Sequence, residues 1–145
     1  MGLAQVFEHL LGVGMTTVIS FNDYIVALCA SLPELYKTDT IELSCAAEPY
    51  PVDLDVATTL GIIVTELVNN AYVHGFGASG GKIHVTLQVT PIGAVLSISD
   101  NGRGYKEAAT TRRGMGLVRR LVAQVGATMT HETGEGTTWT VVLAG

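Results

Sequence analysis

The spacing of apolar and polar residues along the chain predicts both helices and strands. Segments in which apolar residues recur at helical spacing predict helices at residues 1–13, 21–32, 53–74 and 114–125. Segments in which apolar and polar residues alternate predict strands at residues 40–46, 82–90, 94–99, 127–132 and 137–143. In the first of these strands, Ile41, Leu43 and Cys45 fall on one face.

Local signals mark where these elements begin and end. Ser20 is predicted to be the N-cap of the helix that follows it, and Pro33 marks the end of that helix. Asp53 or Asp55 caps the long helix, and a group of glycines ends it. The stretch 48–52 carries two prolines and is predicted to be a connector.

Three main helices and two antiparallel hairpins predict an α/β fold. We expect a two-layer sandwich with a mixed, mostly antiparallel sheet that carries the helices on one face. A length of 145 residues is typical of one small domain with a single core. This domain is predicted to occupy residues 21–145, with residues 1–20 as a separate linking segment.

Composition narrows the possible classes of function. The net charge is −5, and no basic cluster is present beyond two arginine pairs, so nucleic-acid binding is not expected. No uninterrupted apolar run reaches the ~18 residues of a membrane span, and no secretory signal pattern opens the chain. Cys29 and Cys45 lack metal-site spacing and fit a reduced cytoplasmic protein, in which they act as small apolar residues.

One part of the long helix, T-E-L-V-N-N-A-Y-V-H-G-F at residues 65–76, carries polar residues in an apolar setting. Glu66, Asn70 and His74 recur every four residues and therefore share one face of a helix. Buried polar groups are costly without partners, so this column indicates a bound ligand. The alternative is the solvated face of an amphipathic helix.

Three further motifs follow this helix in the sequence. I-S-D-N-G-R-G occupies 98–104, R-R-G-M-G-L occupies 112–117, and G-E-G-T-T-W-T-V-V-L occupies 134–143. In this order and spacing, the four motifs resemble the N box, the two glycine boxes and the final Gly-Thr strand of histidine-kinase ATP-binding domains. These domains share a superfamily with gyrase, a heat-shock chaperone and the mismatch-repair ATPases. The resemblance covers residues 40–145 and implies the Bergerat ATP-binding fold, with ATP and Mg2+ as ligands.

The resemblance implies roles that suit the chemistry of individual residues. Asn70 offers a neutral amide oxygen to Mg2+, and Glu66 is the catalytic base or holds a metal-bound water. Asp100, when ionised, only accepts hydrogen bonds, so it pairs with the adenine amine and rejects the guanine carbonyl. Thr137 lies near the adenine and bonds it directly or through water. Gly114 opens a helix whose free N–H groups attract phosphate.

Other positions in the motifs are also implied to contact the nucleotide. They are Asn69, His74, Gly102, Gly104, Arg113, Gly114, Met115, Gly116 and Leu117. For three of them a different role stays open, because His74 can bond a carbonyl at a helix end, Asn69 can be structural, and Arg113 can be a solvated surface residue. Trp139 is predicted to belong to the core.

The chain departs from a complete kinase in one respect, because none of its four histidines lies in a phosphoacceptor box. The residues before 40 are similar to the entry into the catalytic domain of one histidine-kinase subfamily, whose box reads H-R-x-x-N-N. Residues 1–20 are accordingly predicted to be the tail of a dimerisation helix and a linker, and the chain is expected to be a fragment or a stand-alone domain. The implied partners are the protein's own dimerisation, phosphoacceptor and sensor domains and a downstream response regulator. The segment itself is expected to be cytoplasmic and to make no membrane contact.

Two rival functions stay open. One is an anti-sigma-factor serine kinase, since members of that group have a similar length and carry the same boxes. The other is a partner-binding module that holds nucleotide without turnover, although intact Glu66, Asn70 and Asp100 argue against it. The stretches 50–67 and 114–127 resemble the histidine-kinase subfamily more closely than the serine kinases.

Overall fold

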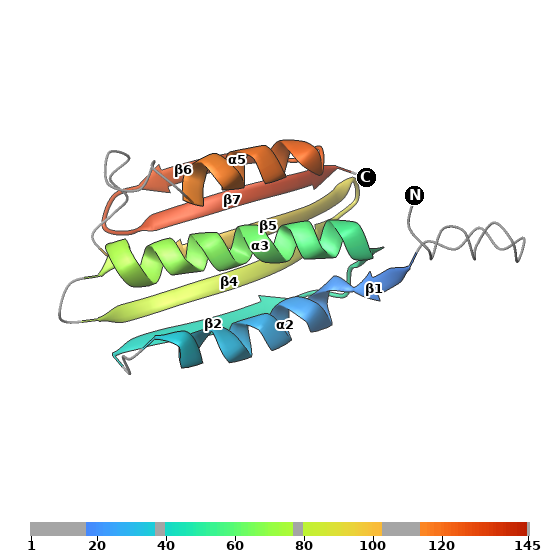
Figure 1. The fold of residues 1–145 in the computed structure, drawn as a ribbon. Coiled ribbons are helices and arrows are strands. Elements are labelled where there is room, and N and C mark those ends of the chain that lie inside the picture. Colours follow the sequence, from blue (N-terminus) through green and yellow to red (C-terminus); the bar gives the residue numbers. More distant parts are fainter. Residues whose placement is uncertain (1–16, 37–39, 77–79, 103–113, 145) are drawn as a thin grey trace, which may run out of the picture.

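Helices and one main sheet form the two layers of the structure, a computed structural model that describes residues 17–36, 40–76, 80–102 and 114–144. The helices α2 (Phe21–Ser31), α3 (Leu54–Asn70) and α5 (Gly114–Gln124) lie side by side on one face of the sheet (Figure 1). The predicted two-layer α/β sandwich with three main helices is therefore confirmed. The helix predicted at residues 1–13 falls outside the described residues.

The main sheet has five strands in the order β2-β4-β5-β7-β6. Their bounds are β2 (Ile41–Ala47), β4 (Gly81–Thr90), β5 (Gly93–Asp100), β6 (Thr128–Thr133) and β7 (Thr137–Ala144). Strand β2 runs parallel to β4, and the other neighbouring pairs are antiparallel. The parallel pair is connected through α3, because a tight turn cannot join parallel neighbours. The sheet is thus mixed and mostly antiparallel, as predicted.

A second, two-stranded sheet was not predicted from the sequence. Strand β1 (Val18–Ser20) pairs antiparallel with β3 (Pro51–Asp53). The prediction of a connector at 48–52 is therefore wrong for Pro51 and Val52, which belong to β3. Its prolines suggested irregular structure, but Pro51 occupies the first position of a short strand, where proline is tolerated. Three residues are also too few to show an alternating pattern.

The boundaries of the predicted helices are largely confirmed. Helix α2 ends at Ser31 and continues as the 3-10 helix η1 (Leu32–Leu35), which contains the proline that was expected to end it. Asp53 occupies the N-cap position of α3, but its side chain makes no capping hydrogen bond. The α-helical part of α3 ends at Asn70, and residues Ala71–Gly75 form the π-helical turn η2. The prediction of one continuous α-helix to His74 is wrong over this last turn.

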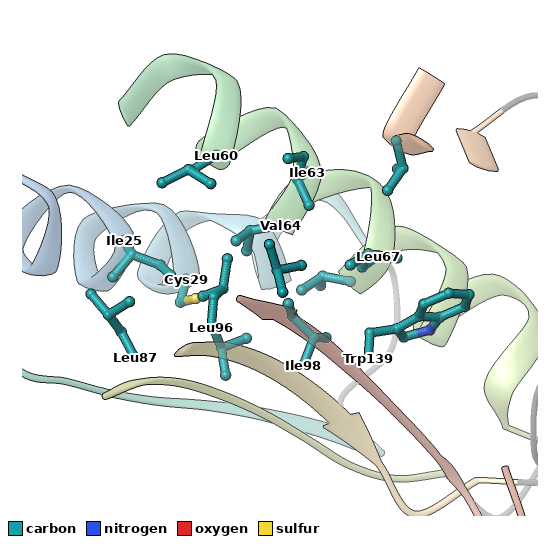
Figure 2. Close-up of a cluster of buried hydrophobic side chains, with 14 of the residues drawn as sticks. Ile25, Cys29, Leu60, Ile63, Val64, Leu67, Leu87, Leu96, Ile98 and Trp139 are labelled. Carbon is teal, nitrogen blue, oxygen red and sulfur yellow. The ribbon is translucent and has the colours of Figure 1, made fainter. Parts of the chain in front are cut away.

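An apolar layer fills the space between the helices and the sheet (Figure 2). Leu60, Ile63 and Leu67 project from α3 and lie over the sheet, where Ile98 of β5 and Trp139 of β7 face them. The first four are at most 1% exposed and Trp139 is 4% exposed, which confirms that the tryptophan belongs to the core. Each fully buried leucine or isoleucine contributes about 1.5–3 kcal/mol to the stability of this layer.

The two cysteines lie where α2 meets the edge strand β2. Both are free thiols, and Cys29 is buried while Cys45 is partly buried. A hydrogen bond that the Cys29 thiol donates to Cys45, together with burial, raises the pKa of Cys29 far above its ordinary range. Cys29 therefore stays protonated and packs as a small apolar residue, as the sequence suggested.

Within the described residues, the stretch Leu54–Val73 is long and apolar enough to span a membrane by length and composition alone. More than half of it (56%) is buried inside this fold, where it forms the central helix of the core. Its apolar character is thus explained by packing against the sheet.

Candidate functional site

The sequence motifs converge at one end of the sandwich. The C-terminal ends of α3 and β5 and the N-terminal ends of β7 and α5 lie together at the left of Figure 1. The strand register supports this arrangement, since Asp100 at the end of β5 pairs with Thr137 at the start of β7. Motifs that are separated by up to about 70 positions in the sequence are therefore neighbours in the fold.

Glu66 and Asn70 lie in the last two turns of α3, and both are partly buried. The amide nitrogen of Asn70 donates a hydrogen bond to the sulfur of Met115, 3.3 Å away at the start of α5. Met115 is fully buried, so this contact ties the first motif to the third from inside the fold. With its nitrogen engaged, Asn70 has its amide oxygen left to accept a ligand, because no described residue donates to that oxygen.

The predicted column of Glu66, Asn70 and His74 is present only in part. Glu66 and Asn70 are one α-helical turn apart, as expected. The α-helical geometry on which the prediction rested ends at Asn70, because residue 74 lies in the π-helical turn η2. The side chain of His74 lies outside the described residues, and its predicted contact with phosphate stays a prediction.

Asn69 has a partner that the sequence did not reveal. The hydroxyl of Tyr36 donates to the Asn69 side-chain oxygen at 2.6 Å, across 33 positions of sequence. No motif contains Tyr36, and nothing in the local pattern marks it, because the contact depends on how the chain after η1 packs against α3. This bond supports the structural role that the sequence left open for Asn69, and its predicted contact with the nucleotide stays a prediction.

Asp100 ends β5 with a partly buried carboxylate that is held by backbone groups. Its Oδ1 accepts a hydrogen bond from the Gly102 N–H at 2.9 Å, and the Thr137 N–H also donates to this side chain. Burial raises the pKa of Asp100 above its ordinary value, whereas the two N–H donors act in the opposite direction. The carboxylate is thus fixed in orientation and partly removed from water, as a recognition group requires.

Thr137 and Gly136 lie directly beside Asp100. Thr137 is buried, and its hydroxyl lies 3.2 Å from the hydroxyl of Thr133. A Cβ added to Gly136 would lie 2.1 Å from the backbone oxygen of Asp100, so this position must be glycine for the two segments to approach. The sequence contained this signal in its G-E-G-T motif, but Gly136 was not among the predicted site residues.

The start of α5 presents residues with different surroundings. Met115 points into the core, Gly116 is exposed with open space around it, and Leu117 is partly buried. Gly114 is the first residue of the helix, so the N–H groups of the first turn have no intrahelical partners. Gly104 and Arg113 lie outside the described residues, and their predicted contacts stay predictions.

An open surface pocket at the far end of the sheet is unrelated to these motifs. It has a volume of about 460 Å³ and is lined by Tyr50 and residues 89–93. The turn between β4 and β5 forms one side, at the opposite end of β5 from Asp100. None of the predicted site residues lines it.

Comparison with known proteins identifies the family. Residues 55–144 match the family described as histidine kinase-, DNA gyrase B-, and HSP90-like ATPase, over more than half of the chain. The chain belongs to this ATPase family. The matched range contains Glu66, Asn70, Asp100 and Thr137, and it begins one residue after the start of α3. No curated protein sequence matches the chain.

Solved structures confirm that this ATPase domain has the fold of histidine-kinase catalytic domains. The histidine kinase domain of the blue-light-activated kinase of Erythrobacter litoralis aligns with a TM-score of 0.79 and 23% identity over 85% of this chain and 64% of its own. The longer form of that kinase aligns with a TM-score of 0.81 and 22% identity, covering 87% of this chain and 42% of its own. The mycobacterial sensor histidine kinase MprB aligns with a TM-score of 0.72 and 20% identity, covering 90% of this chain and 98% of its own. The chain thus spans less than two thirds of the length of the first two structures.

The residues of this ATPase domain suit a magnesium nucleotide. Among the described residues, no group of three or more histidine, cysteine, aspartate or glutamate side chains is arranged to hold a metal by itself. Mg2+ takes one or two protein oxygens and completes its shell with phosphate and water. The single amide oxygen of Asn70 fits this requirement, and Glu66 lies one turn away.

Proposed function

We propose that this chain is the ATP-binding catalytic domain of a two-component sensor histidine kinase. It transfers the γ-phosphate of ATP to a histidine on a dimerisation domain outside residues 1–145. The observation that carries the proposal is the fixed, partly buried carboxylate of Asp100 at the same end of the sandwich as Glu66 and Asn70. The likeness to histidine-kinase catalytic domains supports it.

Asp100 selects the base. Its oxygens accept hydrogen bonds, and two backbone N–H groups hold them in place. An adenine amine can donate to such a carboxylate, whereas guanine would bring an acceptor against it. A partly buried charge that faces a lone pair is strongly unfavourable, so ATP is preferred over GTP.

Asn70 and Glu66 act at the phosphates. Asn70 would hold Mg2+ through its amide oxygen, and the ion would supply positive charge to offset that of the phosphate oxygens. Glu66 accepts the proton of the attacking histidine or orients a metal-bound water. The N–H groups at the start of α5, with Gly116 leaving open space beside them, receive the phosphate chain.

The resemblance of residues 50–67 and 114–127 favours the subfamily with an H-R-x-x-N-N phosphoacceptor box. In that setting the partners are the protein's own dimerisation and phosphoacceptor helices, a sensor domain and a response regulator. The domain then works in the cytoplasm, where ATP is available, and this segment does not contact the membrane.

A labelling experiment tests the proposal. The chain is incubated with Mg2+ and γ-labelled ATP, alone and with a dimerisation-helix segment that carries an H-R-x-x-N-N box. We expect acid-labile, alkali-stable label on the added helices and none on the chain alone. Acid-stable label on a serine of an added anti-sigma partner would favour the serine-kinase alternative, and label on His9 of the chain alone would contradict an external acceptor.

A further inference from the structure

Tyr36 reaches the candidate site from a part of the chain that no motif includes. It follows the 3-10 helix η1, and its backbone N–H donates to the Pro33 carbonyl at 3.1 Å. Its backbone is extended at that point, with φ −116° and ψ 130°. The chain therefore leaves η1 beside the C-terminal end of α3, and the Tyr36 ring lies against that helix.

Three residues of the α3 region surround the Tyr36 side chain. Its hydroxyl donates to Asn69 at 2.6 Å, and its ring stacks on Tyr72 with centroids 3.9 Å apart and planes 5° from parallel. Glu66 is near enough for its charge to act on the phenol. Residues 66, 69 and 72 are spaced three apart, so Tyr36 lies along one strip of the helix surface.

The hydroxyl of Tyr36 is held in its donating form. Burial raises the pKa of Tyr36 above its ordinary value, and the neighbouring Tyr72 and Glu66 raise it further. The phenol therefore remains protonated at neutral pH. Its proton is therefore available for the hydrogen bond to Asn69.

The contacts of Tyr36 fall on both sides of a change in helix winding. Asn69 belongs to the α-helical part, which ends at Asn70, and Tyr72 belongs to the π-helical turn that begins at Ala71. Asn70 is the residue at the junction, and its nitrogen is bonded to Met115 on the other side. Short π-helical turns are frequent at functional sites and need support from the surrounding structure.

We propose that Tyr36 is a positioning residue that clamps this junction and thereby fixes the direction in which Asn70 presents its amide oxygen. This inference rests on the proposed function, in which that oxygen binds the magnesium of Mg-ATP. Tyr36 holds the strip formed by Asn69 and Tyr72, while Met115 holds the Asn70 nitrogen. The two contacts restrain the junction from opposite sides.

The test compares nucleotide binding with and without metal in the variant Tyr36→Phe, which removes the hydroxyl and keeps the stacked ring. Calorimetric titration with ATP is done in excess MgCl2 and, separately, in EDTA. We expect Mg-ATP binding to weaken about three- to tenfold, the factor that corresponds to one neutral hydrogen bond, and metal-free binding to stay within about twofold. Tyr50→Phe, at the far end of the sheet, is the matched control and should change neither value.

A double-mutant cycle links the effect to Asn69. In the background of Asn69→Ala, the substitution Tyr36→Phe should cost almost nothing further, because its acceptor is already gone. Full Mg-ATP affinity in Tyr36→Phe, or an equal loss with MgCl2 and with EDTA, would overturn the positioning role while leaving the proposed function intact. A wild-type chain that binds no ATP under either condition would instead overturn the proposed function and this inference with it.

Discussion

The charge of Asp100 is expected to lower the stability of the fold, although the proposed recognition of the nucleotide requires it. Its pKa is raised above the ordinary value of 3.8, mainly by burial, so the ionised form is less stable in the folded chain than in the unfolded one. The contribution of the protonated carboxyl group to stability is fully present at pH values below its pKa in the unfolded chain. That contribution is lost as the pH rises through its higher pKa in the folded chain. At neutral pH the carboxylate is therefore held at a cost to stability.

The variant Asp100→Asn should accordingly have a higher Tm than the wild type at pH 7, because a neutral group of the same shape replaces the charge. We expect a shift on the order of a few degrees, which shrinks as the pH is lowered towards about 3. Differential scanning calorimetry across this range measures it. A lower Tm at pH 7 would mean that the Gly102 and Thr137 donors outweigh burial.

Glu66 and Asn70 lie one turn apart, but their replacement should affect different steps, phosphoryl transfer and magnesium-dependent binding respectively. Asn70→Ala removes the amide oxygen and should abolish the magnesium dependence of ATP binding, because no other protein oxygen is expected to take its place. Glu66→Gln keeps size and hydrogen bonding, so binding should persist while phosphoryl transfer slows about 10²-fold or more. Binding titrations and single-turnover transfer assays separate the two, and full transfer by Glu66→Gln would exclude the base role.

Tyr72 offers a test of how the helix end is packed. Its hydroxyl oxygen is buried, and no described residue forms a hydrogen bond with it. Tyr72→Phe should keep the stack on Tyr36 and remove an unsatisfied polar group, so the free energy of unfolding should be unchanged or higher by about 1 kcal/mol. Urea denaturation measures this value, and a clear loss of stability would show that the hydroxyl has a partner.

At the scale of elements, the start of α5 is where helix stability and ligand access conflict. Gly116 is exposed with nothing near its missing Cβ, so alanine fits there and should stabilise the helix by about 0.5–1 kcal/mol. The same methyl group would occupy the space into which the phosphates are proposed to approach. Gly116→Ala should therefore raise Tm and weaken ATP binding, whereas Gln124→Ala at the other end of α5 should leave binding unchanged. Unaltered affinity in Gly116→Ala would place the phosphates elsewhere.

The elements that the sequence predicted well are those with long periodic patterns. The hairpin of β4 and β5, with alternating residues such as Ile83, Val85 and Leu87 buried, and the apolar face of α3 follow directly from burial on one side of the sheet. Strands β1 and β3 were not predicted because three residues are too few to show an alternating pattern. The π-helical turn after Asn70 was not predicted because helical spacing alone does not distinguish α from π winding over a single turn.

At the scale of the whole molecule, the topology brings the predicted residues to one end of the sandwich. The motif residues Glu66, Asn70, Asp100 and Thr137 could be selected from sequence because their chemistry and order are distinctive. Tyr36 could not be, since its contact with Asn69 spans 33 positions and depends on how the chain after η1 packs against α3. A sequence pattern reports which side chains can do chemistry, while the groups that hold them in place emerge only from the fold.

The proposed nucleotide site is tested directly by the affinities of the wild-type chain and of Asp100→Asn for ATP and GTP, measured by titration calorimetry in the presence of Mg2+. We predict that the wild type binds ATP in clear preference to GTP. The variant should bind ATP more weakly by about 1.5–3 kcal/mol, the contribution of one charge-assisted hydrogen bond, and should lose most of the preference. Equal affinities of the two proteins for ATP, or a wild type that binds ATP and GTP alike, would contradict the role of Asp100 and with it the proposed nucleotide site.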